Sequence, residues 1–311
     1  MEINYKEIES NSVGNKQDYI MHSMDFEEFL WAKGYKENQI EELYECMKEC
    51  KPLTTTQFDV MMNNFKDYMI LGGMPAVVAR YIENKNFSGV ISMQEQIIRD
   101  YEEDISKYAE GLDKARILNA FRKVAVFLGN KNKKFQVSKI ADGARNREYR
   151  GVSDWLSDAG IINVSYCMEE CALPLKGNYN PENYRLYYAD TGLLIASLDE
   201  EAQDDLRKNQ NFNTYKGAIY ENIVSDMLVK AGYDLYFYKN EKGTIEMDFF
   251  IRDKNSLIPV EVKANDNSTV SLNTMIDSEN YKDIKYGIKL CNKNIGFNGK
   301  FYTFPYFMTF L

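Results

Sequence analysis

The sequence predicts an α/β fold of the α+β type, in which helices come first and strands gather toward the C-terminus. Three observations predict it. Apolar residues recur at helical spacing through the first 160 residues, two alternating stretches follow at 161–166 and 184–188, and residues 243–265 alternate as two strands around a polar turn. We therefore expect a helical region over 1–110, a unit of helices and a hairpin over 111–192, and a mixed sheet flanked by helices over 193–311.

The N-terminal region carries local signals for helix ends. In "MHSMDFEEFLWAKGY", Asp25 stands at an N-cap position and Glu28 at the capping-box spacing. The stretch "FKDYMILGGMPAVVARYI" is interrupted by a Gly-Gly pair and Pro75, which predicts two helices rather than one. A long amphipathic helix with an acidic outer face is predicted over 90–109.

The middle of the chain has the order of elements of a winged helix-turn-helix. Residues 113–130, 137–144 and 147–160 have apolar residues at helical spacing. The alternating stretches at 161–166 and 184–188 would then be the two strands of the wing. Three helices followed by a hairpin predict a module that could bind DNA.

Basic residues gather in the same unit, although the whole chain carries a net charge of −9. Segment 131–150 holds seven basic residues and two acidic ones. In a winged helix, the N-terminal residues of the third helix enter the major groove, so DNA is a predicted partner. A protein-docking module with a solvated basic surface is the alternative. The candidate DNA contacts are Lys134, Lys139, Arg145, Arg147 and Arg150.

The stretch "GTIEMDFFIRDKNSLIPVEVKAN", residues 243–265, places charges where a buried sheet would place apolar side chains. Successive side chains of a strand face opposite sides. One face would be core and would contain Ile245, Met247, Phe249 and Ile251, with Ile258, Val260 and Val262 on the next strand. The other face would contain Glu246, Asp248, Glu261 and Lys263.

Two interpretations of these charges remain open. One is a solvated outer face whose charges pair weakly across strands. The other is a divalent-cation site, because Mg²⁺ prefers carboxylate oxygens and a neighbouring lysine can orient water. The preceding stretch "YKGAIYENIVSDMLVKAG" predicts a helix with an apolar stripe from Ile219 to Leu228 and an end at Gly232. Glu221 borders this stripe and could face the site.

The order of a helix glutamate, a strand aspartate and a strand Glu-x-Lys resembles the PD-(D/E)XK, or restriction-endonuclease-like, superfamily. The resemblance implies that Asp248 and Glu261 hold Mg²⁺ or Mn²⁺ and that Lys263 assists the attacking water. Glu221 would complete the ligand shell directly or through water, and Glu246 has no assigned part. The implied activity is metal-dependent hydrolysis of DNA. An inactive DNA- or protein-binding module is the alternative.

A longer succession of motifs runs from "MDFEEFLWAKG" through "GGMPAVV", "YYADTGLL" and "KGAIYEN" to "PVEVKA". It resembles prokaryotic AAA-type ATP-binding proteins that end in the domain of unknown function 4143. In that family a P-loop ATPase core precedes a helical lid, a winged helix and a nuclease-like domain. This chain contains no G-x-x-x-x-G-K-[ST], so we expect no ATP hydrolysis from it alone and interpret 1–110 as a lid-like remnant. An intact ATPase homologue, or a second copy of the chain, would be a partner.

Composition argues against several other classes. No apolar run approaches the roughly 20 residues that span a bilayer, and the N-terminus has neither a basic start nor a hydrophobic segment. We therefore expect a cytoplasmic protein with no membrane partner. His22 is the only histidine, which argues against a histidine-rich metal site and against a Ser/His or Cys/His hydrolase.

Overall fold

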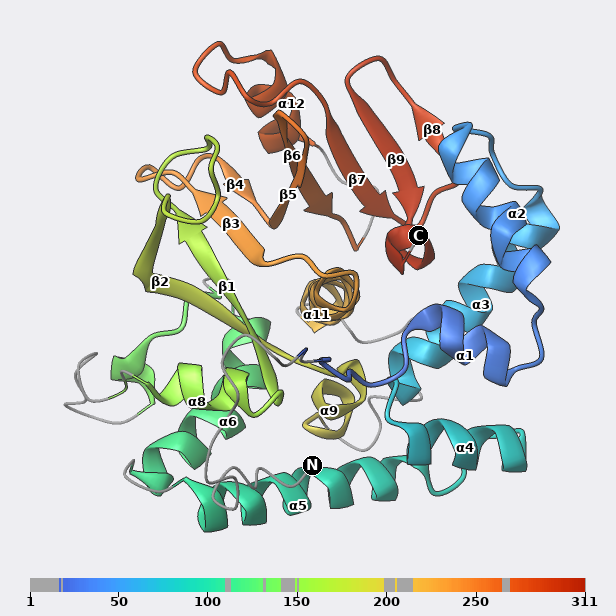
Figure 1. Ribbon diagram of the computed structural model, residues 1–311, viewed down its shortest axis with the longest axis vertical. Coiled ribbons are helices and arrows are strands. Elements are labelled where there is room, and N and C mark those ends of the chain that lie inside the picture. The colour runs from blue at the N-terminus through green and yellow to red at the C-terminus, as the bar shows by residue number, and fades with distance from the viewer. Residues whose placement is uncertain are drawn as a thin grey trace.

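The computed structural model describes residues 17, 19–109, 113–130, 133–140, 149, 151–198, 205, 215–264 and 269–310. Within these residues the chain forms an α+β fold, as predicted. Helices make up most of the first half, and two mixed sheets hold most of the C-terminal strands (Figure 1).

The N-terminal region is helical, and its helices begin and end where the local signals predict. Asp25 caps α1 by accepting a hydrogen bond from the Glu28 N–H, and the Glu28 carboxylate accepts one from the Asp25 N–H, which completes the capping box. α3 ends just before the Gly-Gly pair, and α4 begins at Pro75. The elements are α1 (Phe26–Ala32), α2 (Glu37–Lys48), α3 (Thr55–Leu71), α4 (Pro75–Asn84) and α5 (Val90–Tyr108).

Three helical elements and a hairpin follow in the predicted order. The second of them is only a short 3₁₀ turn in the described residues. Residues 141–148 and 150, which include Arg145, Arg147 and Arg150, lie outside the described part of the chain. The assignment as a winged helix therefore stays a prediction. The elements are α6 (Lys114–Gly129), η2 (Val137–Lys139), α8 (Val152–Asp158), β1 (Ile162–Met168), β2 (Tyr179–Tyr188) and α9 (Thr191–Ala196).

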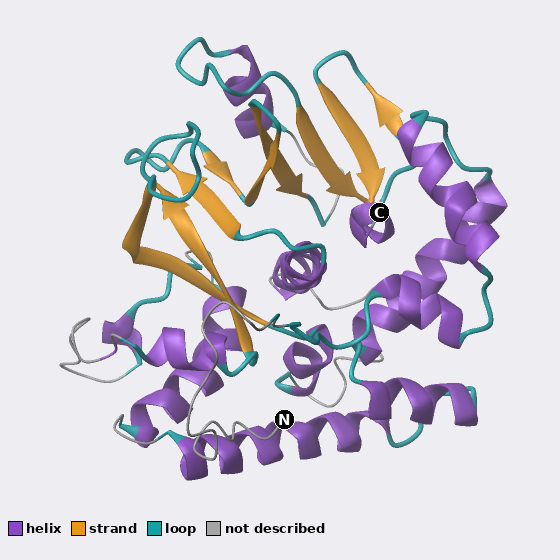
Figure 2. Cartoon of the chain, in the orientation of Figure 1, coloured by secondary structure: helices purple, strands orange, loops and turns teal. Residues whose placement is uncertain are grey.

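The C-terminal region builds most of both sheets around one helix. Its first elements are α11 (Tyr215–Lys230), β3 (Leu235–Lys239), β4 (Glu246–Met247), β5 (Phe249–Asp253) and β6 (Ser256–Val262). They are followed by α12 (Val270–Asp277), β7 (Gly287–Cys291), β8 (Gly296–Phe297), β9 (Phe301–Pro305) and η3 (Tyr306–Phe310). The four-stranded sheet has the order β2-β1-β3-β4, and the five-stranded sheet has the order β5-β6-β7-β9-β8 (Figure 2).

The hairpin β1–β2 is joined to the C-terminal strands rather than standing apart. β1 pairs in parallel with β3, with Ser165 opposite Leu235 and Cys167 opposite Phe237. The predicted boundary between residues 192 and 193 lies inside α9. Along the chain it therefore separates β1 and β2 from β3 and β4, which belong to the same sheet.

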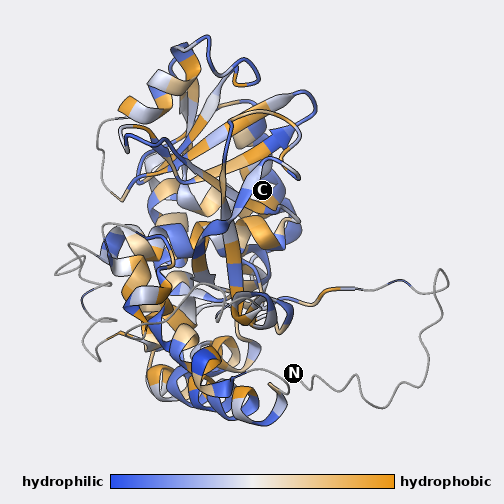
Figure 3. Cartoon of the chain, turned by 90° about the vertical axis from the view of Figure 1, so that its left-hand side faces the viewer, coloured by the Kyte–Doolittle hydropathy of each residue, from blue (hydrophilic) through white to orange (hydrophobic). Residues whose placement is uncertain are grey.

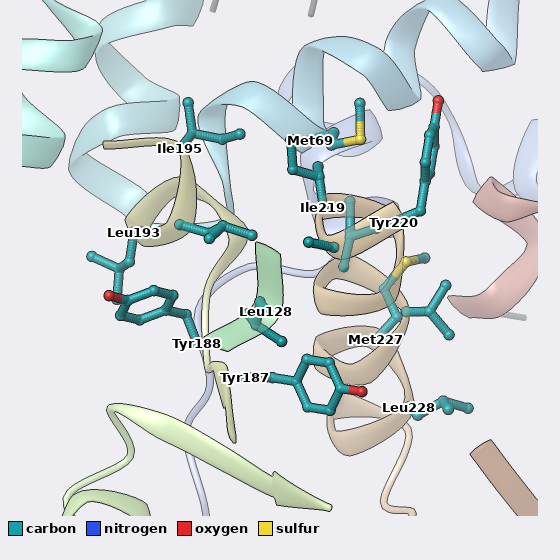
Figure 4. Close-up of a cluster of buried hydrophobic side chains, with 14 of the residues drawn as sticks. Met69, Leu128, Tyr187, Tyr188, Leu193, Ile195, Ile219, Tyr220, Met227 and Leu228 are labelled. Carbon is teal, nitrogen blue, oxygen red and sulfur yellow. The ribbon is translucent and has the colours of Figure 1, made fainter. Parts of the chain in front are cut away.

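Helix α11 lies at the centre of the molecule, with the sheets on one side and α9 on the other (Figure 1). The predicted apolar stripe is buried, but so is every other residue from 218 to 228. The prediction of one apolar face was too narrow, because neighbouring elements pack against all sides of this helix. Figure 4 shows Ile219, Tyr220, Met227 and Leu228 of α11 projecting into the core, with Tyr187 of β2 against the helix.

Polar and apolar residues alternate along most helices (Figure 3). None of the helices in the described residues has the length and apolar character that crossing a membrane requires.

Candidate functional site

The strand predicted over residues 245–251 is broken at Asp248. β4 pairs with β3 in one sheet, whereas β5 pairs with β6 in the other, so the chain changes sheets at this residue. Met247 consequently packs in a small core that includes Leu272 of α12, and Phe249 packs in the main core. The predicted single core face is therefore wrong, because the change of sheet shifts the alternation on either side of Asp248.

The break turns the Asp248 carboxylate toward β6. Its Oδ2 accepts a hydrogen bond of 2.9 Å from the backbone N–H of Val262. Val262 is the middle residue of the Glu261-x-Lys263 motif. Asp248 is thereby fastened to the motif through the backbone, although 14 residues separate the two partners along the chain.

Glu261 and Lys263 form an ion pair at the end of β6. Lys263 Nζ lies 2.8 Å from Glu261 Oε1, and the Glu261 side chain is only 3% exposed. Burial raises the pKa of Glu261, although Lys263 and Lys289 both act to lower it. The other oxygen, Glu261 Oε2, is buried and has no hydrogen-bond partner among the described residues. Lys263 itself is held through its backbone, since its N–H donates to Leu290 O and its carbonyl accepts from the Tyr306 hydroxyl.

Glu221 reaches the site from α11 and is 4% exposed. Lys133 Nζ forms an ion pair with its Oε1, and the Tyr187 hydroxyl donates to its Oε2 at 3.5 Å. Arg185 Nη1 also lies near this carboxylate, 3.9 Å from the same Oε2. Three side chains from outside α11 thus surround this one carboxylate.

Arg185 of β2 lies at the centre of the carboxylates and is 2% exposed. Its Nη2 is bonded to Glu246, and its Nη1 is 3.9 Å from an oxygen of Glu221 and 3.9 Å from one of Asp248. The guanidinium carbon stands 4.0 Å from the ring centroid of Phe237, a cation–π contact. Nη1 and Nε have no hydrogen-bond partner among the described residues. At 3.9 Å neither carboxylate satisfies Nη1.

The surroundings shift the pKa values of two of these carboxylates in opposite directions. Burial, followed by the nearby charge of Glu221, raises the pKa of Asp248 to about 7. Burial also acts on Glu246, but Arg185 and Lys239 outweigh it and hold the pKa of Glu246 below its ordinary value. Lys239 Nζ is 2.9 Å from Glu246 Oε2. No role could be assigned to Glu246 from the sequence. In the structure it is a partner of Arg185 at the rim of the site.

Two family models match the chain. One is described as a domain of unknown function, DUF8612, and matches residues 62–204; the other, also a domain of unknown function, DUF4143, matches residues 216–307. The chain contains a DUF4143 domain. No curated protein and no solved structure matches the sequence.

The four predicted site residues and Glu246 all belong to the DUF4143 domain. The structure brings Asp248 to the Glu-x-Lys motif and Glu221 to the neighbourhood of Asp248, while Glu261 pairs with Lys263. In the part of the chain that the structure describes, no three or more Asp, Glu, His or Cys side chains are grouped closely enough to hold a metal ion. An ion at this site would therefore rest on one or two carboxylates, as Mg²⁺ commonly does.

Two cations next to the DUF4143 carboxylates come from the preceding region. Lys133 and Arg185 lie within residues 62–204, the DUF8612 match. Sequence reasoning missed both. Arg185 gave a weak signal, since it is a lone basic residue in the otherwise aromatic and apolar run "YRLYY". Lys133 gave no signal beyond its place in the basic segment.

The described part of the predicted DNA surface is small. Lys139 is exposed in η2, and Lys134 is half-buried nearby. Two shallow hollows of the described surface lie elsewhere, one between α5 and α6 and the other along α12. The carboxylates of the DUF4143 domain therefore do not lie in either of them.

Proposed function

We propose that the DUF4143 domain is a metal-dependent nuclease that hydrolyses phosphodiester bonds in DNA. The hydrogen bond from Val262 N–H to Asp248 carries the proposal, because it sets an aspartate beside the Glu261-x-Lys263 motif. Glu221 adds a further carboxylate from α11 within reach of Arg185. These contacts support the proposal, because the sequence resemblance implies an aspartate, a Glu-x-Lys and a helix glutamate at the site.

The donor set fits a hard divalent cation. Asp248 and Glu261 would hold Mg²⁺ or Mn²⁺, and the unpartnered Glu261 Oε2 is an oxygen still available as a ligand. When bound, such an ion lowers the pKa of a coordinated water and stabilises charge on the phosphate oxygens.

Residues of the chain itself would orient the attacking water and supply positive charge. Lys263, whose side chain is 25% exposed, is reachable from solvent and would orient the attacking water. Its backbone bonds to Leu290 and Tyr306 fix its starting position. Arg185, whose Nη1 lies 3.9 Å from an oxygen of Asp248 and 3.9 Å from one of Glu221, would place a positive charge between the two side chains.

Substitution of the two central residues tests the proposal. Asp248→Ala and Lys263→Ala should each lower Mg²⁺- or Mn²⁺-dependent DNA cleavage by about a hundredfold or more, equivalent to about 2.7 kcal/mol. Asp253→Asn is the matched control, since Asp253 is exposed at the end of the same hairpin and should retain full activity. Folding is checked by circular dichroism. If the wild-type protein cleaves no single-stranded, duplex or branched DNA, or if the two variants cleave as well as it does, the proposal is wrong.

One observation favours a second candidate, an inactive binding module. Each carboxylate already has a protein cation: Lys133 pairs with Glu221, Lys239 with Glu246, and Arg185 approaches Asp248. Such a network could simply fasten the two matched regions together. Retained duplex DNA binding in a wild-type protein that cleaves nothing would support this candidate.

A further inference from the structure

The C-terminal turn η3 lies between α11 and the N-terminal helices (Figure 1). Three of its aromatic side chains are paired with rings of α1 and α3. The ring centroids are 6.0 Å apart in the pair Tyr306–Phe65, 6.1 Å apart in Phe307–Phe58 and 5.5 Å apart in Phe310–Phe26. The N-terminal helices therefore hold η3 through aromatic contacts.

Tyr306 is the residue of η3 that reaches the candidate site. Its side chain is 0% exposed, and its ring stacks on Tyr220 of α11, 4.1 Å away between centroids, as well as on Phe65 of α3. The Tyr306 hydroxyl donates a hydrogen bond to the carbonyl of Lys263. A buried tyrosine hydroxyl requires a partner, so this bond ties the position of Lys263 to that of η3.

Lys263 depends on such support because it lies one residue beyond the end of β6. Its N–H donates to Leu290 O at 2.9 Å, and its carbonyl accepts from Tyr306. The side chain is 25% exposed, and its ammonium lies 2.8 Å from Glu261. A lysine has a flexible four-carbon stem, so its ammonium keeps one position only while the backbone beneath it is fixed.

We propose that the N-terminal helices set the position of Lys263 through Tyr306. The inference rests on the proposed nuclease and adds that its site depends on residues outside the DUF4143 match, because Phe65 belongs to the DUF8612 match. Tyr306 is then a positioning residue that acts through Lys263. The helices α1 and α3, which the sequence placed in a lid-like remnant, support the site.

Removal of the hydroxyl alone gives the first test, because Tyr306→Phe keeps the ring and its stacking. Metal-dependent DNA cleavage by the full chain should lose about tenfold in kcat with an unchanged KM, since a displaced Lys263 affects the transition state and not DNA binding. Tyr302→Phe is the matched control. It removes a hydroxyl from a partly exposed ring of β9 and should keep the kcat of the wild type.

Phe65→Leu tests the link to the N-terminal helices. It removes the ring of α3 that stacks on Tyr306 and should lower kcat by about tenfold. Phe29→Leu is the matched control, because Phe29 is equally buried but has its ring contacts within α1, α3 and α4. Both variants should lose stability in urea denaturation, whereas only Phe65→Leu should lose kcat. A kcat loss of the same size in both would refute the link.

The position of the Lys263 ammonium can also be followed without cleavage. Limited acetylation with acetic anhydride, analysed by mass spectrometry, reports how often the ammonium leaves Glu261. Tyr306→Phe should speed the acetylation of Lys263 about threefold or more, because the end of β6 opens more often. Lys242, in the exposed turn between β3 and β4, is the internal standard.

The two readouts separate this inference from the nuclease proposal. If the wild type cleaves DNA and Tyr306→Phe matches it in kcat and in acetylation, Tyr306 does not position Lys263 and the nuclease proposal stands. If the wild type cleaves no DNA, the nuclease proposal fails. The role of Tyr306 then stands if its substitution speeds the acetylation of Lys263, and it fails as well if the rate is unchanged.

Discussion

Helix α11 carries two buried ion-pair clusters that differ in how completely their atoms are bonded. In the first, Lys230 Nζ donates to Asp226 at 2.8 Å, to Met24 O at 3.1 Å and to the Tyr68 hydroxyl at 3.2 Å. All three ammonium hydrogens therefore have partners. In the second, around Glu221, two nitrogens of Arg185 have none among the described residues.

This difference indicates that the Lys230 cluster is structural, whereas the Arg185 cluster belongs to the candidate site. The Lys230 cluster links α11 to α3 and to the residue before Asp25, and a fully bonded buried network of this kind makes the packing rigid. The Arg185 cluster collects three carboxylates but leaves the Nε and Nη1 of Arg185 without a hydrogen-bond partner among the described residues, and buried polar groups of this kind call for an explanation such as a bound water or ion. Glu221 and Asp226 are both buried on α11. The cluster around Asp226 is fully hydrogen-bonded, whereas the cluster around Glu221 leaves donors without partners.

The largest effect on stability is expected in the closed cluster. Lys230→Met leaves Asp226, Met24 O and the Tyr68 hydroxyl without their shared donor and should lower the free energy of unfolding by about 3–5 kcal/mol. Urea denaturation measures it. Lys242→Met, in the exposed turn between β3 and β4, should change the same quantity by less than about 0.5 kcal/mol. A loss below 1 kcal/mol for Lys230→Met would mean that the cluster does not stabilise the fold.

A smaller effect that depends on pH is expected at the open cluster. Arg185→Met should lower the free energy of unfolding by about 2–3 kcal/mol at pH 8, because Glu221 keeps Lys133 and Glu246 keeps Lys239. Asp248 loses the one salt-bridge partner that it has among the described residues, and only the charge of Lys133 still acts on it. Arg252→Met, on the exposed hairpin, is the control.

The sign of the pH dependence follows from the raised pKa of Asp248, about 7 in the folded protein. A folded pKa above the unfolded value of about 3.9 means that this group's contribution to stability falls as pH rises between those two values. Arg185 acts to lower that pKa, so its loss extends the fall to higher pH. The deficit of Arg185→Met should therefore be larger at pH 8 than at pH 5, and an equal deficit at both would refute this explanation.

Features that depend on neighbours along the chain could be predicted from the sequence. The capping box of Asp25 and Glu28, the break before Pro75 and the end of α11 before Gly232 each follow from local backbone chemistry. Gly232 has a φ of 87°, a left-handed conformation that favours glycine at a helix end.

Features that depend on contacts between distant segments could not be predicted from the sequence. The break at Asp248 exists because β4 and β5 belong to different sheets, and strand alternation alone does not report sheet membership. Arg185 lies 61 residues before Glu246, the carboxylate nearest to it, and Lys133 lies 88 residues before Glu221. The sequence therefore pointed to the carboxylates but not to Lys133 and Arg185, the distant cations that contact them.

The smallest effect is expected at Glu246, at the rim of the open cluster. Its side chain is 33% exposed, and it contacts Arg185 and Lys239 rather than Val262 or Glu261. Glu246→Gln keeps an oxygen that can accept from Arg185, so it should cost less than about 1 kcal/mol in the free energy of unfolding. DNA cleavage should fall by less than about tenfold, against the hundredfold loss for Asp248→Ala.

The loss of stability in Glu246→Gln should depend on pH in the same direction as that in Arg185→Met, although the pKa values of Glu246 and Asp248 are shifted in opposite directions. The folded pKa of Glu246 is lowered, so the stability from its carboxylate is present above its unfolded pKa and is lost as pH falls through the folded value. The difference between wild type and Glu246→Gln should therefore shrink toward acidic pH, as measured by urea denaturation. A cleavage loss as large as that of Asp248→Ala would move Glu246 from the rim into the site, and Arg185 would then hold a carboxylate essential for cleavage through a direct bond.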